Sequence, residues 1–177
     1  MQIKIEKLTL ENLKSSQKIV MIEIERKFLI VSDNYKKEAH NETRIVQGFL
    51  NTHKERAVRI RIKGTEAFIT VKGISNKEGT TRFEWEKEIP LEEANMLLRL
   101  CEPNLIEKIR YEVKKGIHFF EIDEFFAKNE GLIIAEIELS EENEEFIKPD
   151  WLGKEVTGDV RYYNSQLSKM PYTNWKL

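Results

Sequence analysis

IEIERKFLIV, residues 22–31, alternates apolar and charged side chains through its first half. Successive side chains of a β-strand point to opposite faces of the sheet, so this alternation gives the strand one apolar and one charged face. The stretch therefore predicts a β-strand. Its charged face could look outward into solvent or inward into a cavity.

The same alternation recurs along most of the chain. Seven further runs show it, at residues 44–51, 57–63, 67–73, 81–89, 106–114, 117–125 and 132–140. Short turn sequences separate several of them, and strands joined by such short connections must be antiparallel neighbours. We therefore predict a mainly β domain of the α+β class, built from eight antiparallel strands.

Few helices are expected, and one domain. Pro90 followed by apolar residues at helical spacing predicts a helix over residues 91–100. Shorter helices are expected at residues 141–146 and 161–168. We take residues 1–20 as an N-terminal extension and residues 21–177 as a single folding unit.

Composition limits the class of partner and the compartment. The 177 residues carry 29 Lys and Arg against 31 Asp and Glu, a net charge of -2, which argues against binding nucleic acid or an anionic membrane through bulk positive charge. Cys101 is the only cysteine, so no intrachain disulfide can form. Apolar runs are too short for a membrane span, and no targeting segment is evident. We expect a cytoplasmic protein.

The charged residues form stripes of both signs on the predicted strands. On the simplest interpretation, these stripes are the solvent-exposed face of an ordinary antiparallel sheet. Two features favour a binding site instead. Arginines stand on several strands, and guanidinium groups bind phosphate in bidentate fashion. Carboxylates also come in pairs two residues apart, an arrangement that suits Mg²⁺ or Mn²⁺: Glu23/Glu25, Glu84/Glu86 and Glu136/Glu138.

Closing such a sheet into a barrel, with its charged stripes inward, would bring the cations and carboxylates into one tunnel. Buried charges must be paired or bound to metal, and both signs are present here. Such a tunnel suits a highly anionic linear ligand such as a polyphosphate. His40, His53 and His118 lack metal-ligand spacing, and the chain has no glycine-rich phosphate loop. Any phosphate chemistry must therefore use side chains.

An ordered series of motifs resembles the CYTH superfamily of triphosphate tunnel metalloenzymes. It begins with EIERKFL at residues 23–29 and covers the chain to about residue 167. The further motifs are QGFL (47–50), RIR (59–61), TVK (70–72), RFEWE (82–86), EKIRY (107–111), EID (121–123), AEIEL (135–139) and EVTGDVRY (155–162).

This resemblance implies an eight-stranded antiparallel barrel that forms a tunnel and hydrolyses triphosphates with a divalent metal, Mg²⁺ or Mn²⁺. It implies substrate binding by Lys27, Arg59, Arg61, Lys72, Lys108 and Arg110. It implies metal binding by Glu23, Glu25, Asp123, Glu136 and Glu138. Lys27, Lys108, Glu84 and Glu86 are the expected catalytic residues.

The expected activity is hydrolysis of inorganic tripolyphosphate, and also of thiamine or nucleoside triphosphates, by in-line attack of metal-activated water. Two alternatives stay open. The chain could be a class IV adenylate cyclase, although no adenine site is located, or a polyphosphate- or nucleotide-binding protein without turnover. Members of the family can form homodimers, but no interface signature stands out here.

One residue departs from the pattern of the bacterial members. These commonly have QGYL where this chain has Phe49, and their tyrosine has been assigned, with the lysine matching Lys108, as a proton acceptor. Phe49 has no hydroxyl group. Either the metal and the carboxylates activate water here, or the chain is slower or altered in substrate.

Overall fold

The computed structural model describes residues 24–53, 56–75, 82–141 and 143–175, so the expected extension at residues 1–20 lies outside the described part. Nine strands dominate it: β1 (Ile24–Ile30), β2 (Asn41–His53), β3 (Arg56–Lys63), β4 (Glu66–Ser75), β5 (Arg82–Glu88), β6 (Ile106–Lys115), β7 (His118–Phe125), β8 (Ile133–Leu139) and β9 (Leu152–Glu155). All eight predicted runs are strands. The ninth strand, β9, was not predicted.

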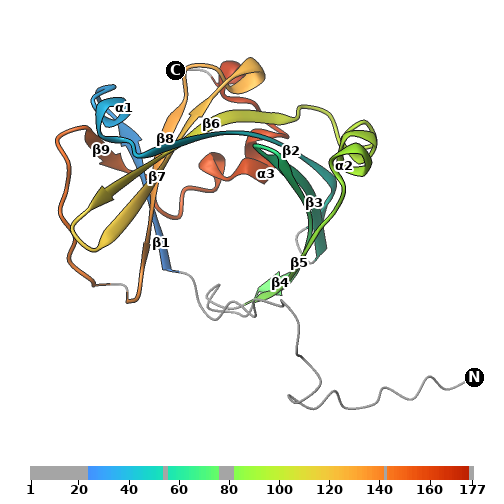
Figure 1. Cartoon of the computed structure of the whole chain (residues 1–177), viewed down its shortest axis with the longest axis horizontal. Coiled ribbons are helices and arrows are strands. Elements are labelled where there is room, and N and C mark those ends of the chain that lie inside the picture. Colours follow the sequence, from blue (N-terminus) through green and yellow to red (C-terminus); the bar gives the residue numbers. More distant parts are fainter. Residues whose placement is uncertain (1–23, 54–55, 76–81, 142, 176–177) are drawn as a thin grey trace, which may run out of the picture.

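The strands form one antiparallel sheet in the order β5-β4-β3-β2-β6-β7-β8-β1-β9. It curls into an arch, with β1 and β4–β5 on opposite sides of the opening (Figure 1). The predicted closed barrel is wrong for the described residues, because β1 pairs with β8 along one edge and with β9 along the other. β9 covers that second edge at Phe28 and Ile30, and among the described residues β5 pairs only with β4.

Short helical segments connect and cover the strands. They are α1 (Tyr35–Glu38), α2 (Leu91–Leu98), η2 (Ala127–Asn129), η3 (Val160–Tyr162), α3 (Asn164–Leu167) and η4 (Tyr172–Asn174). The predicted helix at residues 91–100 is confirmed, two residues shorter. None of the helices in the described ranges could cross a membrane, being too short or too polar.

Two helix predictions need correction. The described residues of 141–146 form no helix: the carboxylate of Glu144 accepts bonds from the amide and hydroxyl of Ser140, and Phe146 packs against Phe28 and Phe120. The segment at residues 161–168 is split, because Tyr163 is extended between η3 and α3.

The apolar faces of the strands look outward and are covered by helices and loops. Under α1 and the loop before β9, Tyr35, Phe120 and Trp151 join one buried cluster. Under α2, Ile60, Ala67 and Leu98 form another. Figure 1 places α1 and α2 outside the arch and α3 within it. The charged alternate residues must therefore line the concave face.

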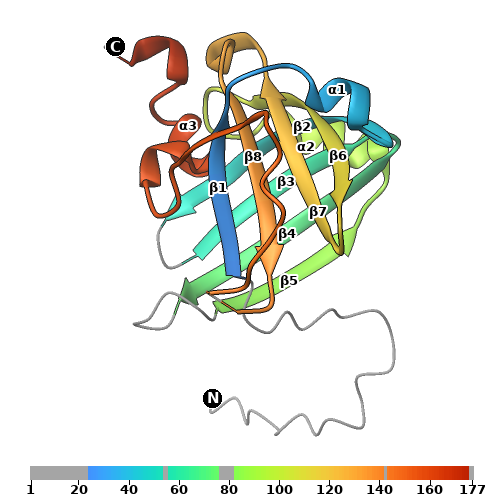
Figure 2. The same ribbon diagram turned by 90° about the vertical axis from the view of Figure 1, so that its left-hand side faces the viewer.

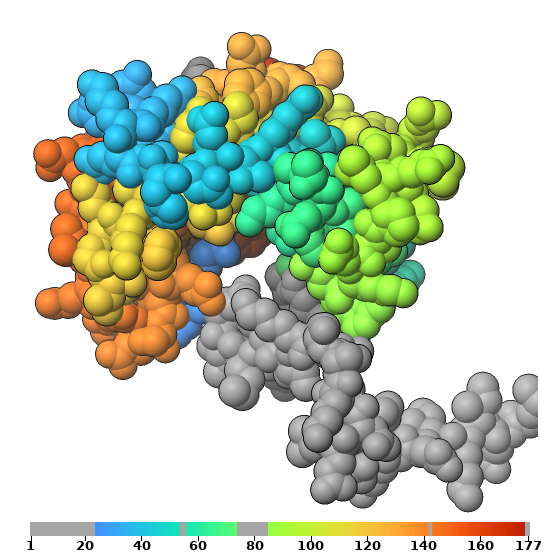
Figure 3. Space-filling model, viewed as in Figure 1, coloured from blue at the N-terminus to red at the C-terminus, as the bar shows by residue number. Residues whose placement is uncertain are grey.

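The C-terminal segment closes one end of this concave face. Leu167 of α3 packs against Ile106, Phe125 and Ile134, which point inward from β6, β7 and β8. Figure 2, turned by 90°, shows the C-terminal segment at one end of the strands. In the space-filling view the ends of the two wings of the sheet lie on opposite sides of the molecule (Figure 3). The polar remainder of the concave face is the candidate site.

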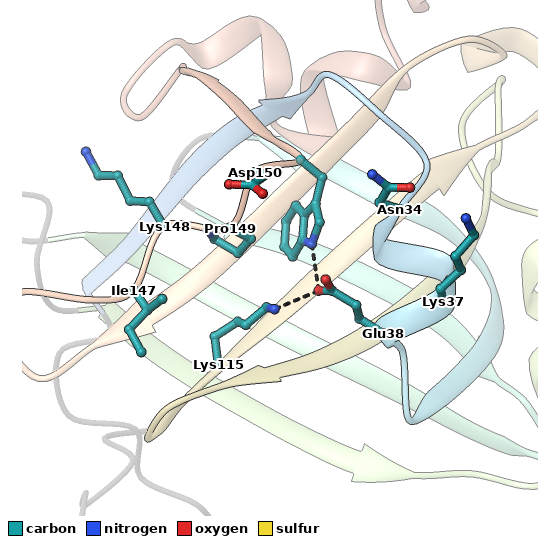
Figure 4. A pocket seen from close by; sticks show the side chains of 9 residues that line it. Asn34, Lys37, Glu38, Lys115, Ile147, Lys148, Pro149 and Asp150 are labelled. Carbon is teal, nitrogen blue, oxygen red and sulfur yellow. Dashed lines mark hydrogen bonds and ion pairs between the residues drawn. The ribbon is translucent and has the colours of Figure 1, made fainter.

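A separate hollow of about 380 Å³ lies between α1 and the loop before β9 (Figure 4). Trp151, which is 1% exposed, forms part of its wall. Its indole donates a 2.9 Å hydrogen bond to Glu38, and Lys115 forms a 2.9 Å ion pair with the same carboxylate. These contacts tie α1 to β6 and to the loop before β9, so we interpret this hollow as structural.

The contact between β2 and the loop that follows α2 depends on Gly48. A methyl group there would lie 2.6 Å from Cδ2 of Leu105 and 2.7 Å from Sγ of Cys101. We predict that Gly48→Ala lowers the free energy of unfolding by about 1–3 kcal/mol, the usual cost of overpacking. Urea denaturation measures this. An unchanged midpoint would contradict the close packing of this loop on β2.

Candidate functional site

Strand alternation brings the predicted charges together on the concave face. β1 contributes Lys27, β6 contributes Lys108 and Arg110, β7 contributes Asp123, and β8 contributes Glu136. The register places Lys27 opposite Glu136 and Arg110 opposite Asp123. Residues that are far apart in the sequence therefore form one charged cluster, which we call the β6 cluster.

Each cation of the β6 cluster is held by carboxylates. The ammonium of Lys27 contacts Glu25 and Glu136. Arg110 forms two 2.7 Å hydrogen bonds with Asp123 and also contacts Glu121 and, at 3.4 Å, Glu136. Burial lowers the pKa of Lys27, but Glu136 and Glu25 more than offset this and leave it raised. Lys27 is therefore charged at neutral pH.

Lys108 and Asp123 form the most buried ion pair of the cluster. Their side chains are 2% and 1% exposed, and Phe125 lies 5.4 Å from the Lys108 ammonium. Burial lowers the pKa of Lys108. Burial alone would raise the pKa of Asp123, but Arg110 and Lys108 outweigh it and hold that pKa below its ordinary value. Asp123 is thus an anion that orients both cations.

A second charged cluster, the β3 cluster, lies on the other wing of the sheet. Arg59 and Arg61 of β3 both reach Glu86 of β5, each at 3.2 Å. Thr70 of β4 donates a 2.6 Å hydrogen bond to Glu86 and accepts one from Arg59 at 3.1 Å. Burial would raise the pKa of Glu86, but Thr70 and the two arginines leave it lowered. Two guanidinium groups thus share one carboxylate.

Three predicted site residues remain to be located: Lys72, Glu84 and Glu23. Lys72 of β4 follows Thr70 on the same face of its strand, and the register puts it opposite Glu84 of β5. Glu23 lies outside the described residues. The structure thus brings most of the predicted site onto one concave face, in the β6 and β3 clusters.

Carboxylates gather beside the β6 cluster. Glu25 and Glu138 lie opposite one another in register on β1 and β8, and Glu136 is two residues from Glu138. Burial, together with the nearby charge of Glu136, raises the pKa of Glu25. Such crowding of oxygen ligands fits a hard divalent cation. Among the residues that the structure describes, no three His, Cys, Asp or Glu side chains are drawn together as a metal site. Glu25 and Glu136 contact Lys27 instead.

Three other residues join the concave face without having been predicted as site residues. Thr70 organises the β3 cluster, Gln47 lies opposite Arg61, and the ring of Tyr163 lies 5.6 Å from the Lys27 ammonium. Strand alternation could have found Thr70 and Gln47, because both share a face with predicted residues. Tyr163 follows the last strand, and no sequence period points to it. Phe49 is buried opposite Arg59.

The structure defines a class of protein in which a curled antiparallel sheet has an apolar back and a concave face of paired cations and carboxylates. Comparison with known proteins agrees with this class. The model of the CYTH domain family matches residues 21–172. An inorganic triphosphatase of Acetivibrio thermocellus is 49% identical over 155 residues, which cover 87% of this chain and 97% of the relative. The chain belongs to the CYTH domain family.

Further relatives support this family assignment. An inorganic triphosphatase of Nitrosomonas europaea is 36% identical over 152 residues, covering 84% of this chain and 97% of that protein. The crystal structure of the inorganic triphosphatase NE1496 superposes with a TM-score of 0.63 at 35% identity, over 84% of this chain and 95% of that one. PH1012 of Pyrococcus horikoshii OT3, at 20% identity and a TM-score of 0.52, covers 69% of this chain and 80% of its own and shares the fold.

The buried pair of Lys108 and Asp123 gives a testable prediction. Asp123→Asn would leave Lys108 buried without its carboxylate, and we expect a loss of about 3–5 kcal/mol in the free energy of unfolding at pH 7. Adding Lys108→Met should recover part of this loss, since the unpaired charge is then removed. Denaturation of both variants measures it. Asp123→Asn as stable as the wild type would contradict the pairing.

The depressed pKa of Asp123 also predicts how this contribution depends on pH. A carboxyl whose pKa is lower in the folded state stabilises the fold above its unfolded pKa of about 3.9. That contribution is lost as the pH falls toward the depressed value. The difference in stability between wild type and Asp123→Asn should therefore shrink below about pH 4. A difference that grows with acidity would contradict it.

Proposed function

We propose that this chain is a divalent-metal-dependent triphosphatase that hydrolyses inorganic tripolyphosphate in the cytoplasm. The observation that carries this proposal is the concave face itself, where the β6 and β3 clusters present cations from opposite wings of one sheet. A linear polyanion needs cations spread along its length. The relatives named inorganic triphosphatase support this choice of substrate.

The cations of the two clusters would bind and orient the phosphates. Arg59 and Arg61 offer guanidinium groups suited to bidentate phosphate contacts, and Lys27 and Arg110 offer charge from the other wing. We assign Lys72 to phosphate binding as well, because it follows Thr70 on the same face of β4. Phosphoryl transfer needs positioning and charge neutralisation more than covalent help, so these side chains supply much of the catalysis.

The carboxylates Glu25, Glu136 and Glu138, with Glu23, would hold the divalent cation. Their donor set is all oxygen, which suits Mg²⁺ or Mn²⁺. When bound, such a cation supplies a Lewis acid for the phosphoryl oxygens and lowers the pKa of water. Glu25 and Glu136 now contact Lys27, so metal binding and the position of Lys27 are coupled.

Lys108 and the carboxylates of β5 are the remaining residues expected to be catalytic. Lys108 is buried as an ammonium paired with Asp123, so we assign it to stabilising charge on the reacting phosphates rather than to accepting a proton. We assign Glu86 to orienting the attacking water from the other wing, and keep Glu84, two residues before it on β5, as a candidate for the same role. Asp123 is engaged by Lys108 and Arg110, which favours a positioning role over its expected role as a metal ligand.

The proposed activity predicts a pattern of phosphate release. With Mg²⁺ or Mn²⁺ we expect rapid release from tripolyphosphate, slower release from pyrophosphate, and none after chelation with EDTA. Thiamine triphosphate and ATP belong in the same assay, since both carry the triphosphate. Tight tripolyphosphate binding without turnover would contradict the proposal and favour a binding protein. Cyclic AMP formed from ATP would instead favour a cyclase.

The carboxylate assignment has its own test. Glu136→Gln combined with Glu138→Gln should lower metal-dependent kcat by about 100-fold or more, because two of the proposed oxygen ligands of the divalent cation lose their charge. The double variant Glu92→Gln with Glu93→Gln, which makes the same change on exposed α2 outside the arch, is the matched control. Equal turnover of the two double variants would contradict the assignment.

A further inference from the structure

Gln47 is a buried polar residue on the concave face whose amide nitrogen has no partner among the described residues. It lies on β2, is 2% exposed, and stands in register opposite Arg61 of β3. Side chains opposite one another in a sheet share a face, so the amide lies beside the guanidinium. An unpaired buried donor is costly, which calls for an acceptor that the protein alone does not supply.

Arg61 adds a second donor at the same place. Its Nε is also buried without a hydrogen-bond partner in the described ranges, while its Nη2 reaches Glu86 at 3.2 Å. Two unsatisfied N–H donors from neighbouring strands are thus turned to one face. The missing partner must therefore be rich in acceptor atoms.

The position of β2 decides what that partner is. In the sheet, β2 lies between β3 and β6, so Gln47 stands between the β3 cluster and the β6 cluster. Lys108 of β6 pairs with Ile45, two residues from Gln47 on the same face. A hydrogen-bond acceptor that binds among these cations is most stable if it carries negative charge. An oxygen of a phosphate chain that spans both clusters meets each condition.

We propose that Gln47 is a substrate-binding residue that donates its amide hydrogen to a phosphate oxygen of the bound triphosphate, midway between the two clusters. This rests on the proposed function. The Nε of Arg61 is the second donor to this phosphate. Gln47 is neutral, so it adds no charge attraction. Its hydrogen bond favours the binding of a phosphate chain that is long enough to reach from one cluster to the other.

The test is Gln47→Met, which keeps the length and much of the volume of the side chain but removes the donor. We expect KM for tripolyphosphate, and its dissociation constant by calorimetry, to rise about 10- to 100-fold, the usual cost of losing a hydrogen bond to a charged group. Stability should be unchanged or higher, because an unsatisfied buried polar group is removed. Pyrophosphate should be affected less than tripolyphosphate.

Gln166→Met is the matched control. Gln166 of α3 is half-buried in a separate hollow with Arg161 and Trp175. It should leave KM and the dissociation constant unchanged. A structural role for Gln47 predicts the reverse of our expectation, with a lower melting temperature and an unchanged KM, and that result would overturn the inference. So would equal losses of affinity for pyrophosphate and tripolyphosphate.

The two proposals fail in distinguishable ways. A wild-type chain that neither binds nor cleaves tripolyphosphate overturns both. A wild-type chain that is active, with Gln47→Met equally active and equally tight in binding, overturns only the role of Gln47. Gln47→Glu gives a second variant: a carboxylate facing the substrate should weaken tripolyphosphate binding more than methionine does, because like charges repel. Equal or tighter binding by Gln47→Glu contradicts the contact.

Discussion

The buried ion pair between Lys108 and Asp123 is the interaction on which the charged interior depends. Both side chains are almost wholly buried, and Arg110 bonds to the same carboxylate. Separating such charges from water is costly unless each has its partner in place. The arrangement is possible because the apolar residues of the same strands look outward, where α1, α2 and Trp151 cover them.

Because the charged side chains of this sheet line its concave face, a nearly neutral chain can present cations to a polyanion. In the structure, carboxylates neutralise the cations of both clusters: Glu136 and Glu25 hold Lys27, and Glu86 holds Arg59 and Arg61. The carboxylates that a metal would need are thus partly those that now hold the cations. Metal and triphosphate should therefore bind cooperatively, and the net charge of -2 says little about the ligand.

Strand alternation in the sequence was enough to predict the eight long strands and the shared face of the charged residues. It could not predict β9, since four residues carry too little periodicity, and that strand pairs with the edge of β1 at Phe28 and Ile30. The same alternation puts Gln47 on the charged face, but a lone neutral amide carries no charge pattern that would mark it as a site residue. The failed helix at residues 141–146 shows tertiary contacts overriding local propensity, through Phe146, which packs on Phe120, and Glu144, which bonds to His118.

The most direct test of the account is a crystal structure of the chain with Mn²⁺ and tripolyphosphate, with the metal located by anomalous diffraction. The account predicts a manganese peak within bonding distance of the carboxylates of Glu25, Glu136 and Glu138, and phosphates that run along the concave face from Arg110 toward Arg61. Tripolyphosphate bound instead in the outer hollow beside Trp151, with Lys37 and Lys148, would contradict it.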